Sequence, residues 1–133
     1  DTIQAAFLNE KIKVIHQYND TRANIAKIYH NEIKHKDIVN FQNADYCQKN
    51  TYHIYPIRTD NRQKLIDYLS DKQIQTGIHY PIPIEQTGAF EIMFTGFNNK
   101  KTRAFSQKLV SLPIHPFMTE QEAKYVVGAI NSF

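Results

Sequence analysis

The chain has 133 residues, of which 41% are hydrophobic and 22% charged, values that are typical of one compact globular domain. That length buries a single core but is too short for a two-domain coenzyme enzyme. The formal net charge of +3 is mild and the basic residues are dispersed, which argues against a nucleic-acid-binding protein. No apolar run approaches the roughly 20 residues of a membrane span. The lone Cys47 excludes an internal disulfide, so we expect a cytoplasmic protein that binds neither nucleic acid nor membrane.

The first 36 residues contain neither glycine nor proline, and their apolar residues recur at steps of three and four, as in a helix with one buried stripe. The stripe comprises Leu8, Ile12, Ile15, Ile25, Ala26, Tyr29 and Ile33. We predict a long N-terminal helix, either kinked or divided in two, with Asn19, Asp20 and Thr21 available to cap a second helix. The helical pattern starts at once, so we expect the chain to begin at a cut edge of a longer protein.

Residues 37–50 are polar and predict a connection, whereas 51–58 alternate aromatic or β-branched residues with others, which predicts a strand. Pro56 cannot donate to a ladder, so this strand is expected at a sheet edge or to be irregular. Thr59 or Asp60 is expected to cap the next helix. The buried face of that helix is predicted to be Leu65, Ile66 and Leu69.

The second half predicts a short strand over 74–80, an irregular segment over 81–98, a helix over 100–109 and a strand over 110–114. Long irregular segments of compact domains are often binding loops. Thr119 and Glu122 have the spacing of a capping box. The face of the helix that follows comprises Ala123, Val126, Val127 and Ile130. Together these elements predict an α+β fold, with a small, mainly antiparallel sheet covered by helices.

Six histidines lie at positions 16, 30, 35, 53, 79 and 115, without the close pairing of zinc ligands on one helix face, so we expect no metal site. The first three are predicted on the surface of the N-terminal helices. His53, His79 and His115 fall in strand-like segments. Residues 77–83 hold an imidazole and a phenol on a rigid segment, since Gly77 permits a sharp backbone and two prolines fix the exit. These residues alone leave two readings open, a binding site or a strand end with His79 and Tyr80 in the core.

Five segments, in order, resemble the DegT/DnrJ/StrS-type sugar aminotransferases. They read DTIQAAFL at 1–8, RANIAKIY at 22–29, YHIYPIR at 52–58, GIHYPIP at 77–83 and SLPIHPFMT at 111–119. The resemblance implies that residues 1–133 are the C-terminal small domain of an enzyme of the aspartate-aminotransferase fold type. Such an enzyme uses pyridoxal phosphate to move an amino group, usually from glutamate, onto a nucleotide-linked keto-sugar, for polysaccharide or antibiotic sugar biosynthesis.

The resemblance also places the coenzyme-binding lysine, the acidic partner of the pyridine nitrogen and the stacking aromatic in a large domain that is absent from this chain. We therefore expect pyridoxal phosphate only in the full-length enzyme, with no catalytic or cofactor-binding residue on this chain, which should be inactive alone. The implied partners are that large domain, the second subunit of a homodimer and the nucleotide-sugar substrate. The chain would contribute to the substrate cleft and to the dimer interface.

For substrate binding, the resemblance points to His53, His79 and Tyr80. Many family members have a second histidine a few residues further on, where this chain has Glu85 followed by Gln86. We retain Glu85 as a substrate-site residue, although a carboxylate there disfavours a phosphate. Residues 89–98 are also less typical and are expected to influence which sugar is accepted.

Two other functions are compatible with the sequence. One is a non-catalytic module that binds a nucleotide-sugar or a protein. The other is a structural role, in which an exposed apolar stripe over residues 3–33 docks on another domain or on a second copy.

Overall fold

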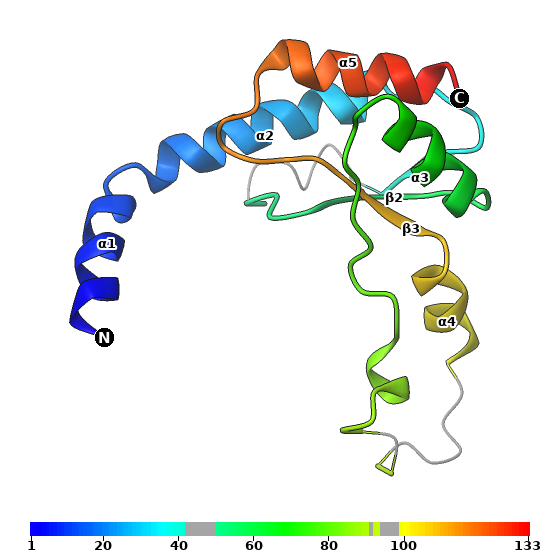
Figure 1. Cartoon of the computed structure of the whole chain (residues 1–133), viewed down its shortest axis with the longest axis horizontal. Coiled ribbons are helices and arrows are strands. Elements are labelled where there is room, and N and C mark those ends of the chain that lie inside the picture. The colour runs from blue at the N-terminus through cyan, green and yellow to red at the C-terminus, as the bar shows by residue number, and fades with distance from the viewer. Residues whose placement is uncertain (42–49, 91, 94–98) are drawn as a thin grey trace.

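The computed structural model describes residues 1–41, 50–90, 92–93 and 99–133; Cys47 therefore lies outside the described residues. Helices and a small antiparallel sheet make up the fold, as predicted (Figure 1). The elements are α1 (Thr2–Ile12), α2 (Ile15–Glu32), β1 (Val39–Asn40), β2 (Tyr55–Arg58), α3 (Arg62–Asp71), a 3-10 turn (Ile84–Gln86), α4 (Lys100–Ser106), β3 (Leu109–Leu112) and α5 (Glu120–Asn131). Within the described residues, no helix combines the length and apolar character needed to cross a membrane.

The sheet has the order β1-β2-β3, and both pairs are antiparallel. The strand that contains Pro56 is therefore central, and its predicted edge position is wrong. The sheet tolerates the proline because β1 pairs only with Ile57 and Arg58, whereas Pro56 lies beyond that pairing, opposite Ser111 of β3. Among the described residues, β2 thus has a paired neighbour on only one side at Pro56, where a missing N–H is least costly.

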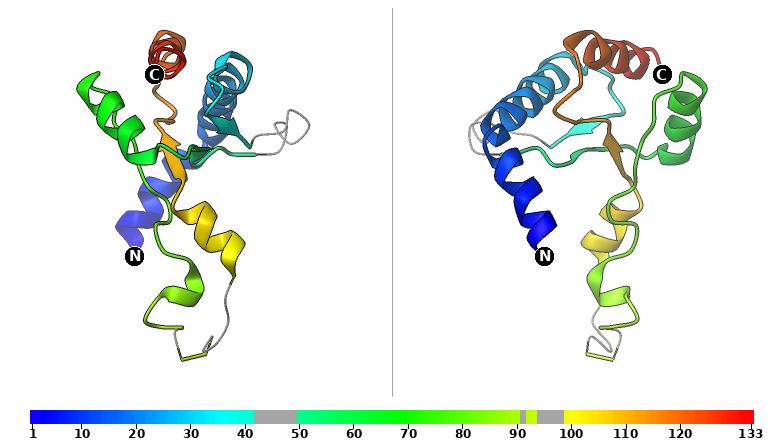
Figure 2. Two further views of the ribbon diagram at one scale, coloured as in Figure 1. Left: turned by 90° about the vertical axis from the view of Figure 1, so that its right-hand side faces the viewer. Right: turned by 60° about the vertical axis from the view of Figure 1, so that its left-hand side comes forward.

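The core lies between this sheet and the helices α2, α3 and α5, with α2 and α5 side by side above it (Figures 1 and 2). Tyr29 of α2 and Tyr55 of β2 are fully buried, and their ring centroids are 5.1 Å apart. The Tyr29 hydroxyl donates a hydrogen bond of 2.8 Å to the carbonyl of Pro113. Burial, followed by the charges of Tyr55 and Glu122, raises the pKa of the Tyr29 phenol well above its usual value.

The N-terminal region consists of two helices that meet at Lys13 and Val14, not at residues 19–21. Those three residues lie inside α2, so the prediction that they cap a helix is wrong. The apolar stripe is divided in the same way. Its C-terminal part, from Ile25 to Ile33, enters the core, whereas Leu8 and Ile12 are 64% and 69% exposed. Helix α1 buries no residue and projects away from the sheet (Figure 1).

Other boundaries differ from the predictions by a few residues. Helix α3 begins after Asn61 without a side-chain cap; the Thr59 hydroxyl instead accepts from the amide of Asn61, and Asp60 pairs with Lys108. The strand predicted over 74–80 is reduced to a single bridge between Gly77 and Ser111. Helix α4 and strand β3 end earlier than predicted, whereas the strand β1 was not predicted.

Helix α5 follows its prediction closely. The Thr119 hydroxyl accepts from the amide of Glu122, and the Glu122 carboxylate accepts from the amide of Thr119 at 2.7 Å. The Thr119 amide and, to a smaller extent, the Thr119 hydroxyl donate to the Glu122 carboxylate and hold its pKa below the usual value. Every apolar residue predicted on the buried face is buried. The box therefore fixes the start of α5, directly after the loop that follows β3.

Below the sheet, two segments project together as an arm, here defined as residues 79–90 and α4 (Figures 1 and 2). The first segment leaves the sheet region after Gly77, and α4 returns to it at the start of β3. The expected irregular segment is confirmed over its described residues, where the 3-10 turn is the main regular feature. The arm thus begins at the histidine-containing segment 77–83.

Candidate functional site

A cavity of about 560 Å³ brings together three histidines from separate parts of the sequence. His53 precedes β2, His79 begins the arm, and His115 follows β3. Their polar neighbours on the wall are Gln75, Thr76 and Ser111. We call this the three-histidine cavity. The structure therefore unites His53 and His79, both expected at the substrate, and adds His115.

The His79 ring is positioned by two residues. Its Nδ1 lies 3.0 Å from the hydroxyl of Ser111, which is only 4% exposed. Gly77 and Ser111 in turn exchange two backbone hydrogen bonds, of 3.0 and 2.8 Å. A Cβ at residue 77 would lie 2.6 Å from Cε1 of His79. Gly77 thus makes room for the His79 ring, which packs against its backbone, and its φ lies outside the left-handed region that favours glycine.

His79 and Tyr80 are both exposed, Tyr80 at 76%, so the reading that places them in the core is wrong. The peptide bond between them is cis. Tyr80 lines a different cavity, of about 500 Å³, between residues 79–87 and α4. That cavity is mostly apolar, and His79 lies on the walls of both. Tyr80 therefore stands beside the three-histidine cavity without lining it.

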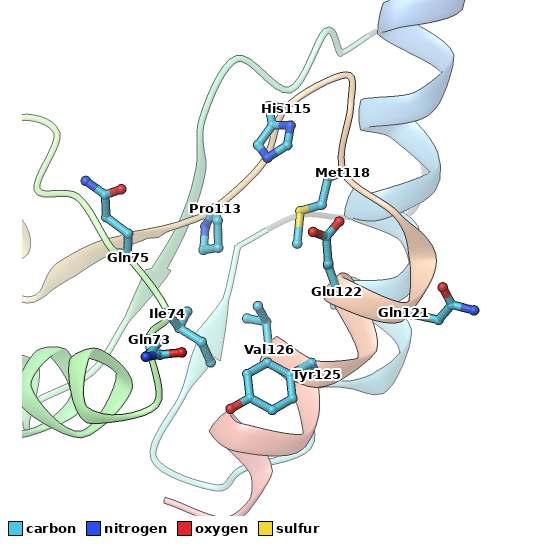
Figure 3. Close-up of a pocket in the computed structure, with 10 residues that line it drawn as sticks. All are labelled: Gln73, Ile74, Gln75, Pro113, His115, Met118, Gln121, Glu122, Tyr125 and Val126. Atoms are coloured by element: carbon cyan, nitrogen blue, oxygen red, sulfur yellow. The ribbon is translucent and has the colours of Figure 1, made fainter.

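His115 was not among the expected substrate residues. Its Nδ1 accepts a hydrogen bond of 3.3 Å from the backbone amide of Phe117, and the ring is exposed. It also lines a further cavity of about 410 Å³ beneath the start of α5, shown in Figure 3. Gln75 and Pro113 belong to both linings. The sequence signal was its strand-like setting beside a proline, which is too general to assign a role.

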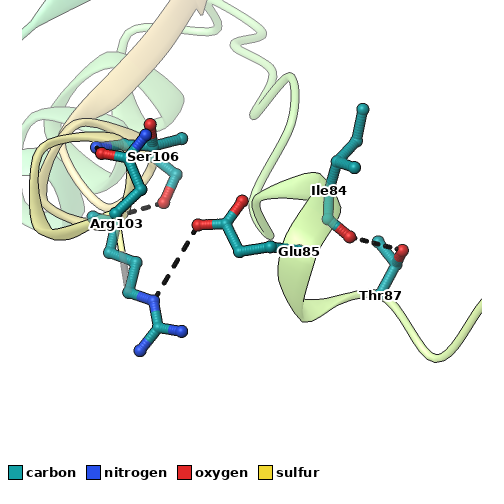
Figure 4. A network of polar contacts seen from close by, with 7 residues as sticks. Ile84, Glu85, Thr87, Arg103 and Ser106 are labelled. Atoms are coloured by element: carbon teal, nitrogen blue, oxygen red, sulfur yellow. Dashed lines mark hydrogen bonds and ion pairs between the residues drawn. The ribbon is translucent and has the colours of Figure 1, made fainter. Parts of the chain in front are cut away.

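Glu85 lies inside the arm, away from the lining of the three-histidine cavity (Figure 4). Its side chain is 9% exposed, and Oε1 is 4.0 Å from Nε of Arg103 on α4. Among the described residues, neither of these two atoms has a hydrogen-bond partner. The Glu85 carboxylate therefore forms a long ion pair between the two segments of the arm. A contact between Glu85 and substrate stays a prediction.

The family model described as "DegT/DnrJ/EryC1/StrS aminotransferase family" matches residues 1–131. This chain belongs to that family. A dTDP-3-amino-3,6-dideoxy-alpha-D-galactopyranose transaminase from Aneurinibacillus thermoaerophilus is 31% identical over all of this chain and 36% of its own length. A dTDP-3-amino-3,4,6-trideoxy-alpha-D-glucose transaminase from Streptomyces venezuelae is 24% identical over 100% of this chain and 35% of its own length. The chain thus spans about a third of the length of these relatives.

Solved structures agree on the fold. The S. venezuelae protein DesV, in complex with a ketimine intermediate, superposes with a TM-score of 0.82 at 25% identity, over 97% of this chain and 35% of DesV. A family aminotransferase from Brucella abortus gives a TM-score of 0.86 at 24% identity, over 100% of this chain and 35% of its own. The three-histidine cavity therefore belongs to a fold found in sugar aminotransferases.

The family depends on pyridoxal phosphate, a coenzyme held by a lysine amine and by a charged partner on its pyridine nitrogen. Among the residues that the structure describes, the lining of the three-histidine cavity contains neither a lysine nor a carboxylate. Its residues do not fit the covalent attachment of this coenzyme, and we assign no coenzyme step to them. Within the described residues there is also no cluster of three or more His, Cys, Asp or Glu side chains suited to a metal ion.

Proposed function

We propose that residues 1–133 are the C-terminal small domain of a pyridoxal-phosphate-dependent aminotransferase that transfers an amino group from glutamate to a nucleotide-linked keto-sugar. The family match over residues 1–131 carries this proposal. It is supported by relatives whose names specify dTDP-sugar transamination. The coenzyme-binding residues would lie in the large domain, within the two thirds of the relatives that this chain does not span. The enzyme would act in the cytoplasm, in the biosynthesis of a polysaccharide or an antibiotic sugar.

In this enzyme the three-histidine cavity would form one wall of the substrate cleft, with His53 and His79 as contacts and Tyr80 at its margin. Imidazole and hydroxyl groups bind and orient oxygen-rich ligands through hydrogen bonds. The wall would fix the substrate while the large domain performs the chemistry. Accordingly, no catalytic residue is proposed on this chain.

Helix α1 supports the proposed partners. Four of its apolar side chains are between 64% and 69% exposed: Ile3, Phe7, Leu8 and Ile12. Such a contiguous apolar surface on one helix normally packs against another domain or subunit. We propose that the large domain and the second subunit of a homodimer cover it. The docking stripe suggested by the sequence is thereby shortened, because residues 25–33 are occupied in the core of this chain.

A chimera tests the proposed function directly. This chain would replace the matching third of the A. thermoaerophilus transaminase, and amino transfer from glutamate to a dTDP-keto-sugar would be followed. We expect turnover in the chimera, and a rise in KM of about tenfold for His79→Ala because one polar contact to substrate is lost. Replacing His16, an exposed residue of α2, by Ala should leave KM unchanged. A folded chimera that binds the coenzyme but shows no transamination would contradict the proposal.

The isolated chain provides the complementary test. We expect no covalent uptake of pyridoxal phosphate and no transamination by residues 1–133 alone. Stoichiometric uptake of pyridoxal phosphate that disappears when one lysine is replaced would contradict the proposal that the large domain binds the coenzyme. Calorimetry with dTDP- and UDP-sugars separates the alternative function, since tight binding by the isolated chain would favour a non-catalytic binding module.

A further inference from the structure

Two of the three imidazoles in the cavity have one ring nitrogen engaged by the chain itself. In His115 the engaged atom is Nδ1, which faces the amide of Phe117. In His79 it is also Nδ1, which faces the hydroxyl of Ser111. These partners determine what the other nitrogen, Nε2, offers to a ligand.

For His115 the position of the ring proton follows from the partner of Nδ1, the backbone amide of Phe117. A backbone amide can only donate, so Nδ1 of the neutral ring must be the acceptor. A neutral imidazole carries one proton, which therefore resides on Nε2. Figure 3 shows the ring projecting from the chain after β3 toward Pro113 and Met118. His115 thus presents an N–H donor on the wall shared by the two cavities.

For His79 the position of the ring proton follows from the burial of Ser111. The Ser111 side chain is buried, and among the described residues its hydroxyl oxygen has no hydrogen-bond partner other than His79. A buried hydroxyl that did not donate would leave its proton unsatisfied. Donation to Nδ1 satisfies the hydroxyl and places the ring proton on Nε2. Packing against Gly77 keeps the ring in this orientation.

The lining of the three-histidine cavity therefore contains two fixed N–H donors and, within the described part of the chain, no carboxylate. The carboxylate of Glu122 lines the neighbouring cavity, where it accepts hydrogen bonds from Thr119. Donors without a matching anion favour a ligand rich in acceptor oxygens. A phosphate needs no acceptor from the wall, whereas each sugar hydroxyl brings a proton that one of the neutral side chains, such as Gln75 or Thr76, would have to accept.

We propose that the three-histidine cavity binds the diphosphate of the nucleotide-sugar through Nε2–H of His79 and Nε2–H of His115, with Ser111 as the positioning residue for His79. The proposal rests on the function proposed above, which makes the ligand a nucleotide diphosphate. A volume of about 560 Å³ exceeds what a single phosphate requires. Two donors from separate segments favour a group with two phosphoryl units.

Nitrogen-resolved NMR of the ¹⁵N-histidine-labelled chain tests the proposal, with inorganic pyrophosphate as the ligand and inorganic phosphate as the single-phosphate comparison. Without ligand, both rings should show the proton on Nε2. Pyrophosphate should shift the Nε2 signals of His79 and His115 together and saturably, and phosphate should bind more weakly. Ser111→Ala and His115→Ala should each weaken pyrophosphate binding about tenfold, the effect of one hydrogen bond to a charged group. His16→Ala should leave it unchanged.

The proposal is overturned if either ring carries its proton on Nδ1, if pyrophosphate shifts neither signal, or if phosphate binds as tightly as pyrophosphate. Thermal unfolding of Ser111→Ala checks that a loss of binding does not reflect a loss of fold. The chimera keeps the two proposals separate. Turnover in the chimera without pyrophosphate binding would refute the diphosphate site alone, whereas binding to both rings with an inert chimera would refute the aminotransferase function alone.

Discussion

Gly77→Ala tests the central geometric claim, that residue 77 lacks a side chain because the ring of His79 occupies that space. The new Cβ would lie 2.6 Å from Cε1 and 3.2 Å from Nδ1 of His79. Ordinary contact begins at 3.4 Å, so the ring must retreat by about 0.8 Å or rotate away. Either movement breaks the bond of 3.0 Å to the Ser111 hydroxyl. Since the obstructing atoms belong to a side chain, we expect the ring to move and the backbone to remain.

The cost in stability should be small. The loss of the His79–Ser111 hydrogen bond and of the preferred His79 rotamer should cost about 1–2 kcal/mol. About 0.4–1 kcal/mol of this is offset because alanine restricts the unfolded chain. We expect a net loss of about 1 kcal/mol in urea unfolding, together with a displaced proton signal on the His79 ring by NMR. Gly128→Ala is the matched control. A Cβ at residue 128 of α5 would meet no described atom within 4 Å apart from the nearby backbone of its own helix, so that change should stabilise the chain by about 1 kcal/mol.

Two results would contradict the packing of His79 against Gly77. If the His79 signals are identical in Gly77→Ala and the parent chain, the ring does not pack against residue 77. If Gly77→Ala instead costs more than about 3 kcal/mol, the strain has been transmitted to the backbone pairing with Ser111. In that case Gly77 is required for the fold rather than for the orientation of His79.

Three further predictions concern the core, the start of α5 and the arm. Tyr29→Phe should cost about 1–2 kcal/mol in urea unfolding, because the Pro113 carbonyl loses its donor. Since burial raises the pKa of Tyr29, the stabilisation by its phenol is complete below about pH 10 and declines at higher pH, where the phenol of the unfolded chain ionises. The Phe variant should lack this decline. Thr119→Ala should cost about 1 kcal/mol by the same measurement. The lowered pKa of Glu122 means that its contribution is present above about pH 4.3 and is lost as the pH falls through the folded-state pKa, so Glu122→Gln should flatten the acid limb of the stability profile. Arg103→Gln should lower the free energy of unfolding by about 1–2 kcal/mol, more than Glu85→Gln does, because it leaves the mostly buried Glu85 carboxylate without its cation. Equal losses of unfolding free energy in the two variants would show that the pair contributes only by packing.

Elements specified by local sequence were predicted well. Thr119 and Glu122 are three residues apart and satisfy each other's backbone amides, so the start of α5 is determined within a single turn. The buried face of α5 likewise follows from spacing alone, and of the face predicted for α3, Leu65 and Leu69 are fully buried while Ile66 is half-buried against the core. Predictions of this kind succeed because the partners of each residue lie on the same helix or directly beneath it.

Predictions failed where distant residues decide the outcome. The position of Pro56 in a central strand depends on how far the two-residue strand β1 extends, which no local pattern encodes. The division of the N-terminal stripe at Lys13 similarly depends on what each half packs against. Residues 25–33 find their partners in α5 and the sheet, whereas α1 has none among the described residues. Apolar periodicity predicted the helices but could not tell which half would be buried within this chain.

The candidate site likewise combines residues that the sequence could predict with residues that only the fold identifies. His53 and His79 stand in segments whose resemblance to a family was visible, yet their convergence on one cavity required the fold. Ser111 and His115 escaped prediction because their roles are defined by contacts. Ser111 reaches His79 only because β3 pairs with Gly77 across the sheet edge. In the same way, the proton of His115 is placed by an amide two residues away. Recognition chemistry at such a site is therefore determined by which nitrogen of each ring the chain itself engages, and that information exists only in three dimensions.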